Sequence, residues 1–194
     1  MQDFLFYTKL GLDHVLDLGA YDHILFLAAL AVPFTFHQWK RVLVLATVFT
    51  LAHCLSLAFS VYGVVTVDVG LIEFLIPVTI VMTALFNFAY VYKKDLDVGL
   101  VLQLLATAFF GLVHGFGFSN YFKMLMAGEE DRVVPLLGFA TGIEISQVTV
   151  ILLVLALGYV AVDLLGLRKS LYTLLASLLI IGITIRLLLE TFPW

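Results

Sequence analysis

The feature that most constrains this chain is a series of long apolar segments that carry almost no charge. Six of them reach or approach the length of about 20 residues that a helix needs to cross the hydrocarbon layer of a membrane. These predicted spans cover residues 20–37, 41–62, 70–91, 98–119, 133–161 and 171–190. A mean hydropathy of +1.13 with only 12% charged residues excludes an ordinary soluble domain, in which about a quarter of the residues are charged. The sequence therefore predicts an all-α integral membrane bundle of about six transmembrane helices, formed by a single domain over residues 1–194.

A stretch of different composition precedes the first span. The segment DFLFYTKLGLDHVLDL mixes apolar and charged residues, which is typical of a helix that lies at the membrane interface. We therefore expect a short N-terminal interfacial helix. The first residues lack the basic start and apolar core of a signal peptide, so we expect no cleaved leader.

The basic residues of the chain indicate its orientation. One side of the predicted spans receives Lys40, Arg41, Lys93, Lys94, Arg168 and Lys169. The other side receives Lys9, Lys123 and Arg132, and the last two are accompanied by the acidic stretch 129–131. Loops rich in lysine and arginine stay in the cytoplasm. We therefore predict a multi-pass protein of the inner, cytoplasmic membrane with both termini outside, which is the periplasm in a Gram-negative cell.

Histidines and carboxylates recur in the outer half of the predicted bundle. His23, His53, His114 and Glu144 each belong to a different span, and His14 can fold back toward them from the interfacial segment. Charged groups inside a membrane are rare and usually functional, and a bound cation would offset the cost of burying them. Imidazoles with one or two carboxylates suit Zn²⁺, Ni²⁺ or Cu²⁺ better than Mg²⁺ or Ca²⁺. We therefore predict a metal site that opens outward, with the candidate ligands His14, Asp22, His23, His53, His114 and Glu144.

Polar residues spaced three apart flank two of these candidate ligands. Residues at this spacing share one face of a helix, and a hydroxyl or amide beside a ligand can fix which imidazole nitrogen binds the metal. We expect this supporting role for Thr50, Ser56, Thr141 and Gln147. Two pairs of glycines four residues apart, Gly111 with Gly115 and Gly138 with Gly142, predict places where helices approach closely.

Each of these residues also has a purely structural interpretation. A lone histidine in a membrane helix can hydrogen-bond a neighbouring backbone carbonyl, and Asp22 can cap the first span instead of binding metal. We expect Glu73 to pair with Arg186 and His37 to lie in a solvated loop. Cys54 is the only cysteine, which excludes an intramolecular disulfide and thiol-rich metal frameworks.

Four motifs in this order resemble the HupE/UreJ family of membrane accessory proteins of hydrogenase and urease systems, and its second branch in particular. They are GLDHVLDLGAYDHILFLAAL, FTLAHCLSL, FFGLVHGFGFS and GFATGIEISQ, and together they span positions 11 to 147. The resemblance implies a bundle of six or seven helices that acts as a secondary permease for Ni²⁺ and also Co²⁺. It implies a link to a metalloenzyme maturation system and leaves an oligomer open. The six candidate ligands fall on the polar positions of these motifs.

The sequence leaves three functions open. The leading hypothesis is transport of a divalent transition metal, Ni²⁺ with Co²⁺ or Zn²⁺ as alternatives, through the outward-opening site. Against a complete pathway, the inner half offers only uncharged polar groups such as Thr47, Asn87 and Gln103. A zinc-dependent intramembrane hydrolase would use the same residues around an open metal position, and a metal sensor or chaperone would bind without transport. No basic block suggests a nucleic-acid partner.

Overall fold

The computed structural model describes residues 2–92, 100–128 and 131–193, and the regular structure in these ranges is helical throughout. This confirms the all-α prediction. The helices are α1 (Gln2–Leu16), α2 (Asp22–Ala31), α3 (Trp39–Val61), α4 (Val69–Tyr92), α5 (Leu100–Leu125), α6 (Val133–Tyr159) and α7 (Lys169–Glu190). Short 3-10 turns occupy η1 (Phe36–Gln38) and η2 (Met126–Gly128), and a π-turn, η3 (Val160–Leu164), extends α6.

Five helices, α3 to α7, are long and apolar enough to cross a membrane. The first predicted span, residues 20–37, does not contain a sixth such helix, because only the 10 residues of α2 are helical there. At 1.5 Å per residue α2 is about 15 Å long, roughly half the thickness of the hydrocarbon layer. The helix ends just before Pro33, which has no N–H to donate to the preceding turn of the helix.

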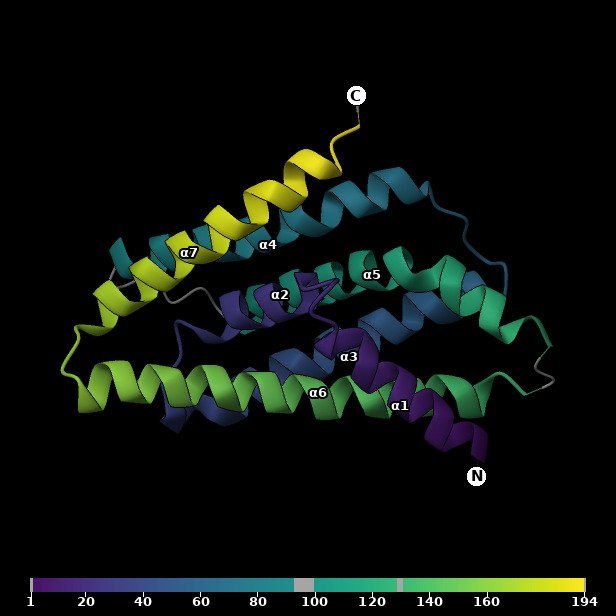
Figure 1. The fold of residues 1–194 in the computed structure, drawn as a ribbon, viewed down its shortest axis with the longest axis horizontal. Helices are drawn as coiled ribbons and strands as arrows, with labels where there is room; N and C mark the ends of the chain where they lie inside the picture. The colour runs from purple at the N-terminus through teal and green to yellow at the C-terminus, as the bar shows by residue number, and fades with distance from the viewer. Residues whose placement is uncertain (1, 93–99, 129–130, 194) are drawn as a thin grey trace.

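The helices α1 and α2 follow one another as two halves of a broken element. α1 starts at the end of the molecule where α6 begins, and α2 runs on toward the end where α3 begins (Figure 1). A turn separates them: the carboxylate of Asp17 accepts the N–H of Gly19 at 2.7 Å, and the carbonyl of Asp17 accepts the N–H of Ala20. An aspartate that bonds the backbone two residues later offers the chain an alternative to helix.

The predicted N-terminal helix is present as α1, and it packs against α6 within the bundle. Its side chains Tyr7 and Val15 are buried. A Cβ added at Gly138 would lie 2.6 Å from the carbonyl oxygen of Phe4, and one at Gly142 would collide with the backbone of Thr8. The predicted close approach at these two glycines is therefore confirmed, and α1 is the helix that uses it.

The second predicted glycine pair joins α5 to α3. A Cβ at Gly111 would lie 2.6 Å from the carbonyl oxygen of Phe49, and one at Gly115 would collide with the Ser56 side chain and the carbonyl of His53. Because α5 lies this close to α3, His114 on α5 comes near the part of α3 that carries His53. This close approach was also predicted and is confirmed.

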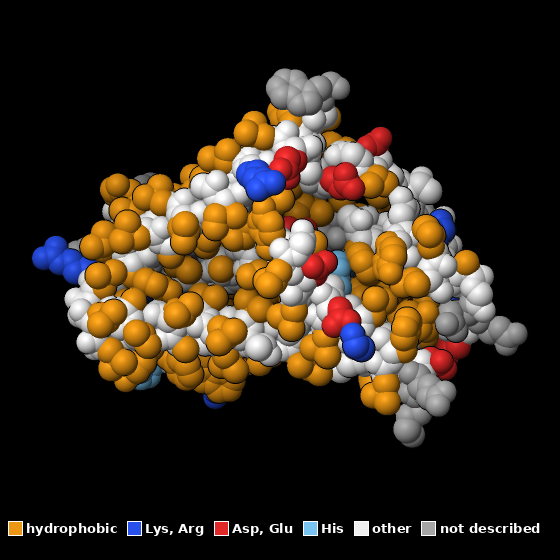
Figure 2. Space-filling model, viewed as in Figure 1, with side chains coloured by type: hydrophobic (Ala, Val, Ile, Leu, Met, Phe, Trp, Pro, Cys, Tyr) orange, Lys and Arg blue, Asp and Glu red, His pale blue; other side chains and the backbone are white. Residues whose placement is uncertain are grey.

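The antiparallel order of the helices gathers Lys40, Arg41, Arg168 and Lys169 at the end of the bundle opposite the N-terminus (Figure 1). Lys93, Lys94, Glu129 and Glu130 lie outside the described residues. Hydrophobic side chains cover most of the face seen in Figure 2, which suits a surface in contact with lipid. Arg186 bonds Glu190, one turn later in α7, at 2.8 Å. The expected pairing of Arg186 with Glu73 was therefore wrong.

Candidate metal centre

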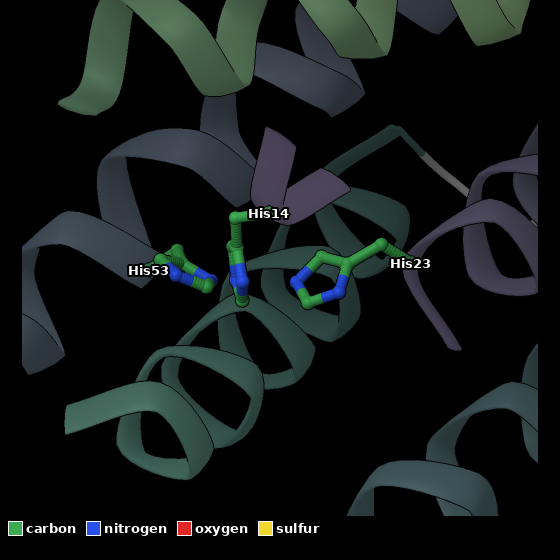
Figure 3. A group of neighbouring side chains, drawn as sticks. All are labelled: His14, His23 and His53. Atoms are coloured by element: carbon green, nitrogen blue, oxygen red, sulfur yellow. The ribbon is translucent and has the colours of Figure 1, made fainter. Parts of the chain in front are cut away.

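Three histidines from separate elements converge inside the bundle. His14 lies in the last turn of α1, His23 at the start of α2 and His53 in the second half of α3. One ring nitrogen from each lies within 4.8 Å of the other two. The ring centres of His14 and His23 are 4.5 Å apart, and that of His53 lies 5.7 Å from each. Figure 3 shows the rings of His23 and His53 extending toward that of His14 from opposite sides. We call this group the imidazole cage.

The break between α1 and α2 is what positions two members of the cage. A continuous helix would place His14 and His23, nine residues apart, about 13 Å from one another along its axis. The turn at Asp17 brings the end of α1 close to the start of α2. The rings of His14 and His23 therefore lie next to each other. Irregular backbone between helices lines binding sites in known transport proteins.

Asp22 acts on His23 and does not belong to the group of three nitrogens. Its Oδ1 lies 3.0 Å from Nδ1 of His23 and accepts the backbone N–H of the same residue at 2.8 Å. With the proton on Nδ1 held by the carboxylate, the lone pair of Nε2 is available to a cation. Asp22 is the first residue of α2 and Tyr21 is its N-cap, so the capping interpretation of Asp22 was wrong. One oxygen of Asp22 bonds both the backbone N–H and the ring of His23.

His114 lies beside the cage. Its ring centre is 5.3 Å from that of His23, and its Nε2 lies 3.1 Å from the hydroxyl of Thr79 on α4. Its Nδ1 is buried and has no hydrogen-bond partner within the described part of the chain. His114 is therefore the nearest candidate for a fourth nitrogen ligand.

The cage nitrogens have unmet hydrogen-bonding capacity. Nε2 of His14, Nε2 of His23 and both ring nitrogens of His53 are buried without a partner among the described residues. Leaving a buried polar atom unsatisfied costs about 1–3 kcal/mol. Several such atoms aimed at one point are costly unless a ligand meets them, and a cation that binds neutral imidazoles fits this need.

Glu144 lies away from the cage, on the seam between α6 and α3. Its carboxylate accepts hydrogen bonds from Thr47 at 2.6 Å and from Thr50 at 2.7 Å. The group of three close ligand atoms does not include it. The structure therefore brings together three of the six predicted ligands, puts Asp22 and His114 beside them, and places Glu144 in a separate polar cluster.

The four predicted supporting residues bond other groups. Thr50 bonds Glu144 and, at 3.1 Å, Gln147. Ser56 donates to the carbonyl of His53 and Thr141 to that of Leu137, each at 2.8 Å. These hydroxyls satisfy backbone or carboxylate oxygens and touch no imidazole nitrogen in the described hydrogen bonds.

Thr79 is the contact that sequence reasoning missed. It belongs to a row of polar residues, Thr79, Thr83 and Asn87, spaced four apart on the otherwise apolar helix α4. This spacing puts the three side chains on one face of the helix, which was the available signal. All three are buried.

A surface hollow reaches His14, one of the three histidines of the cage. It has a volume of about 630 Å³, and its lining includes His14, Asp13, Asp17 and Tyr121. Asp13 also pairs with Lys9 one turn earlier in α1. Histidine atoms are visible beside acidic side chains near the middle of the face in Figure 2. We call this opening the acidic entrance.

Comparison with known proteins agrees with the resemblance seen in the motifs. The family model described as "HupE / UreJ protein" matches residues 1–191. No curated protein and no solved structure matches the chain.

Proposed function

The chain belongs to the HupE/UreJ family, and from this premise we propose that it carries a divalent transition-metal ion across the membrane through the imidazole cage. The family is associated with nickel and cobalt transport or with accessory functions. Nickel is accordingly the first candidate for the cargo, followed by cobalt and zinc. Imidazole nitrogens suit each of these ions.

The convergence of His14, His23 and His53 is the observation that supports this proposal most strongly, because their ligand atoms lie within 4.8 Å of one another. In the proposed site these three bind the ion, His114 adds a nitrogen, and Asp22 orients His23. A cation held by neutral imidazoles exchanges more readily than one held by several carboxylates, since fewer opposite charges must be separated on release.

The acidic entrance supports capture from the side that carries the N-terminus. Asp13 and Asp17 line the hollow that leads to His14. Acidic groups around a cleft raise the local concentration of cations and speed their association. We assign this side to the periplasm and the end with Arg41 and Lys169 to the cytoplasm, in agreement with the distribution of basic residues. Supply of the ion to a metalloenzyme maturation system would follow on the cytoplasmic side.

A hydrolase would need a base next to a metal-bound water. Asp22 is engaged by His23, and the hydroxyl of Ser56 is engaged by the carbonyl of His53. Glu144 is bonded to two threonines. These contacts favour transport over hydrolysis for the imidazole cage.

The experiment that tests the proposal measures both binding and passage. Purified protein is analysed for bound metal, then reconstituted in liposomes that contain a dye responsive to Ni²⁺, Co²⁺ or Zn²⁺. We expect about one ion per chain and dye quenching for the parent, and loss of both for His53→Ala. The matched control is His37→Ala, since His37 is exposed in η1 far from the cage. Binding without passage would favour the hydrolase or a sensor, and full binding by His53→Ala would contradict the site itself.

A further inference from the structure

A second cavity lies on the other side of the imidazole cage, toward the end that carries Arg41. It has a volume of about 130 Å³ and lies between α2, α3, α4 and α5. Its polar lining consists of Gln38, Arg41, Thr83, Asn87, Gln103 and Thr107. Liquid water occupies about 30 Å³ per molecule, so the space accommodates several waters or a partly hydrated ion. We call it the inner cavity.

An aromatic pair separates the inner cavity from the cage. Phe26 and Phe49 stack with ring centres 4.7 Å apart, and both side chains are fully buried. Each ring centre lies 5.2 Å from that of His114. The ring centre of Phe26 also lies 6.0 Å from that of Phe110, and Phe110 lines the inner cavity. The pair therefore touches a histidine beside the cage on one side and the wall of the cavity on the other.

The polar face of α4 runs past this aromatic pair. Thr79 bonds His114, and the hydroxyl of Thr83 donates to the carbonyl of Thr79 at 2.8 Å. Thr83 and Asn87 then line the inner cavity. Hydroxyl and amide oxygens thus continue from the imidazoles into the inner half of the molecule. Asn87 and Gln103, two of the uncharged polar residues expected in the inner half, both line this cavity.

Arg41 closes the far side of the inner cavity. Its guanidinium donates two hydrogen bonds to Oε1 of Gln103, at 3.2 and 3.0 Å, and lies 5.8 Å from the ring of Phe34. No carboxylate among the described residues forms an ion pair with it. A positive charge at this position repels a cation that moves in either direction, as charged barriers in other pores do.

We propose that the inner cavity is the exit chamber for a divalent cation that leaves the imidazole cage, closed from the cage by Phe26 and Phe49 and from the cytoplasm by Arg41 held on Gln103. This inference rests on the proposed transport function. In the described state Phe26 and Phe49 are stacked and Arg41 is bonded to Gln103. Passage requires the aromatic pair to separate and Arg41 to leave Gln103, in that order.

The test measures access to the chamber and needs no metal. Cys54→Ser removes the only cysteine, and Thr107→Cys then places one thiol on the wall of the inner cavity. Leu105→Cys on the same helix is the matched control, because Leu105 is 63% exposed on the apolar surface whereas Thr107 is buried. Inverted vesicles are treated with a small cationic methanethiosulfonate reagent. We expect slow modification of Thr107→Cys, a several-fold faster rate when Arg41→Ala is added, and no change for Leu105→Cys.

Further arms separate this inference from the transport proposal. Arg41→Ala should keep the metal content of the parent, since the cage is untouched, and should release metal from preloaded liposomes faster. Gln103→Leu should accelerate modification of Thr107→Cys as well, because Arg41 loses its acceptor. Equal modification rates with and without these two changes would overturn the exit chamber even if the parent binds and transports metal. If Arg41→Ala and Gln103→Leu accelerate modification of Thr107→Cys but the parent binds no metal, the inference of a gated chamber stands and the proposed transport function is rejected.

Discussion

At the scale of single residues, the site depends on which nitrogen of each imidazole is free. Asp22 holds Nδ1 of His23 and leaves Nε2 available, and Thr79 holds Nε2 of His114 and leaves Nδ1 available. His53 has no such partner among the described residues, so both of its nitrogens are free. A carboxylate or hydroxyl behind a ligating histidine orients the ring and raises its basicity.

Asp22→Asn tests the orienting role of the carboxylate. Asparagine keeps an oxygen for the backbone N–H of His23 but loses the charge that holds the imidazole, so metal affinity should fall by about 10–100-fold. Competition titration with a chelator of known affinity measures the change. The matched control is Asp68→Asn, since Asp68 is exposed and accepts a backbone N–H at the start of α4. Unchanged affinity in Asp22→Asn would limit Asp22 to its hydrogen bond with the backbone N–H of His23.

Glu144→Gln tests the assignment of the separate polar cluster. Glutamine can accept from one of Thr47 and Thr50 through its oxygen and donate to the other through its amide nitrogen, and the carboxylate is not part of the cage. We expect the metal content of this variant to equal that of the parent when measured by elemental analysis. A loss as large as that of His53→Ala would mean that Glu144 is a ligand and that the three-histidine set is incomplete.

At the scale of elements, the break after α1 and the glycine contacts bring the histidines together. Gly142 lets the backbone of α1 pass against α6, and this contact holds the end of α1 that carries His14. Gly115 does the same for α5 against α3, near His53. The small residues act here by allowing backbone contact, which suits packing between helices in a membrane.

Gly142→Ala should therefore damage the site from a distance. Its Cβ would collide with backbone atoms of α1, which cannot move aside as a flexible side chain can, and such overpacking typically costs about 1–3 kcal/mol. We expect a lower melting temperature and a reduced metal content. Gly182→Ala is the control, since a Cβ there meets no atom within 4 Å. Equal melting temperatures for the two variants would contradict the proposed docking of α1.

The sequence predicts the long spans well because about 20 apolar residues in a row leave few alternatives to a membrane helix. It predicts the shortened α2 and the turn at Asp17 poorly. The first depends on the N–H that Pro33 lacks, and the second on the hydrogen bond between Gly19 and Asp17. The glycine pairs are visible as a pattern, but the pattern does not name the partner helix. Glu144 shows the same limit. The sequence predicted the helix that carries Glu144, but it did not predict that this side chain faces Thr47 and Thr50 on α3.

At the scale of the whole molecule, His14 is shared by the acidic entrance and the imidazole cage. Phe26 and Phe49 lie between His114, beside the cage, and the inner cavity. Carboxylates line the entrance, imidazole nitrogens form the cage, and Arg41 lines the inner cavity. In the proposed pathway this order of charges would attract a cation to the acidic entrance, and Arg41 would repel a cation at the inner cavity in either direction.

The charge at the entrance makes a prediction about rate. Asp13→Asn removes one carboxylate from the hollow without touching the turn at Asp17. Because exposed charges act on association and are screened by salt, uptake into liposomes should slow at low ionic strength and match the parent at high ionic strength. Bound metal at saturation should be unchanged. A deficit that persists at high salt would give Asp13 a direct role in binding.

X-ray absorption spectroscopy of the zinc-loaded protein tests the central claim most directly, because it identifies the atoms around the ion. The account predicts three or four nitrogen neighbours at about 2.0–2.1 Å, with the outer-shell scattering of imidazole rings, and no such zinc spectrum from His53→Ala, which should retain no ion. A shell of oxygen atoms without imidazole scattering, or a spectrum that His53→Ala leaves unchanged, would contradict it.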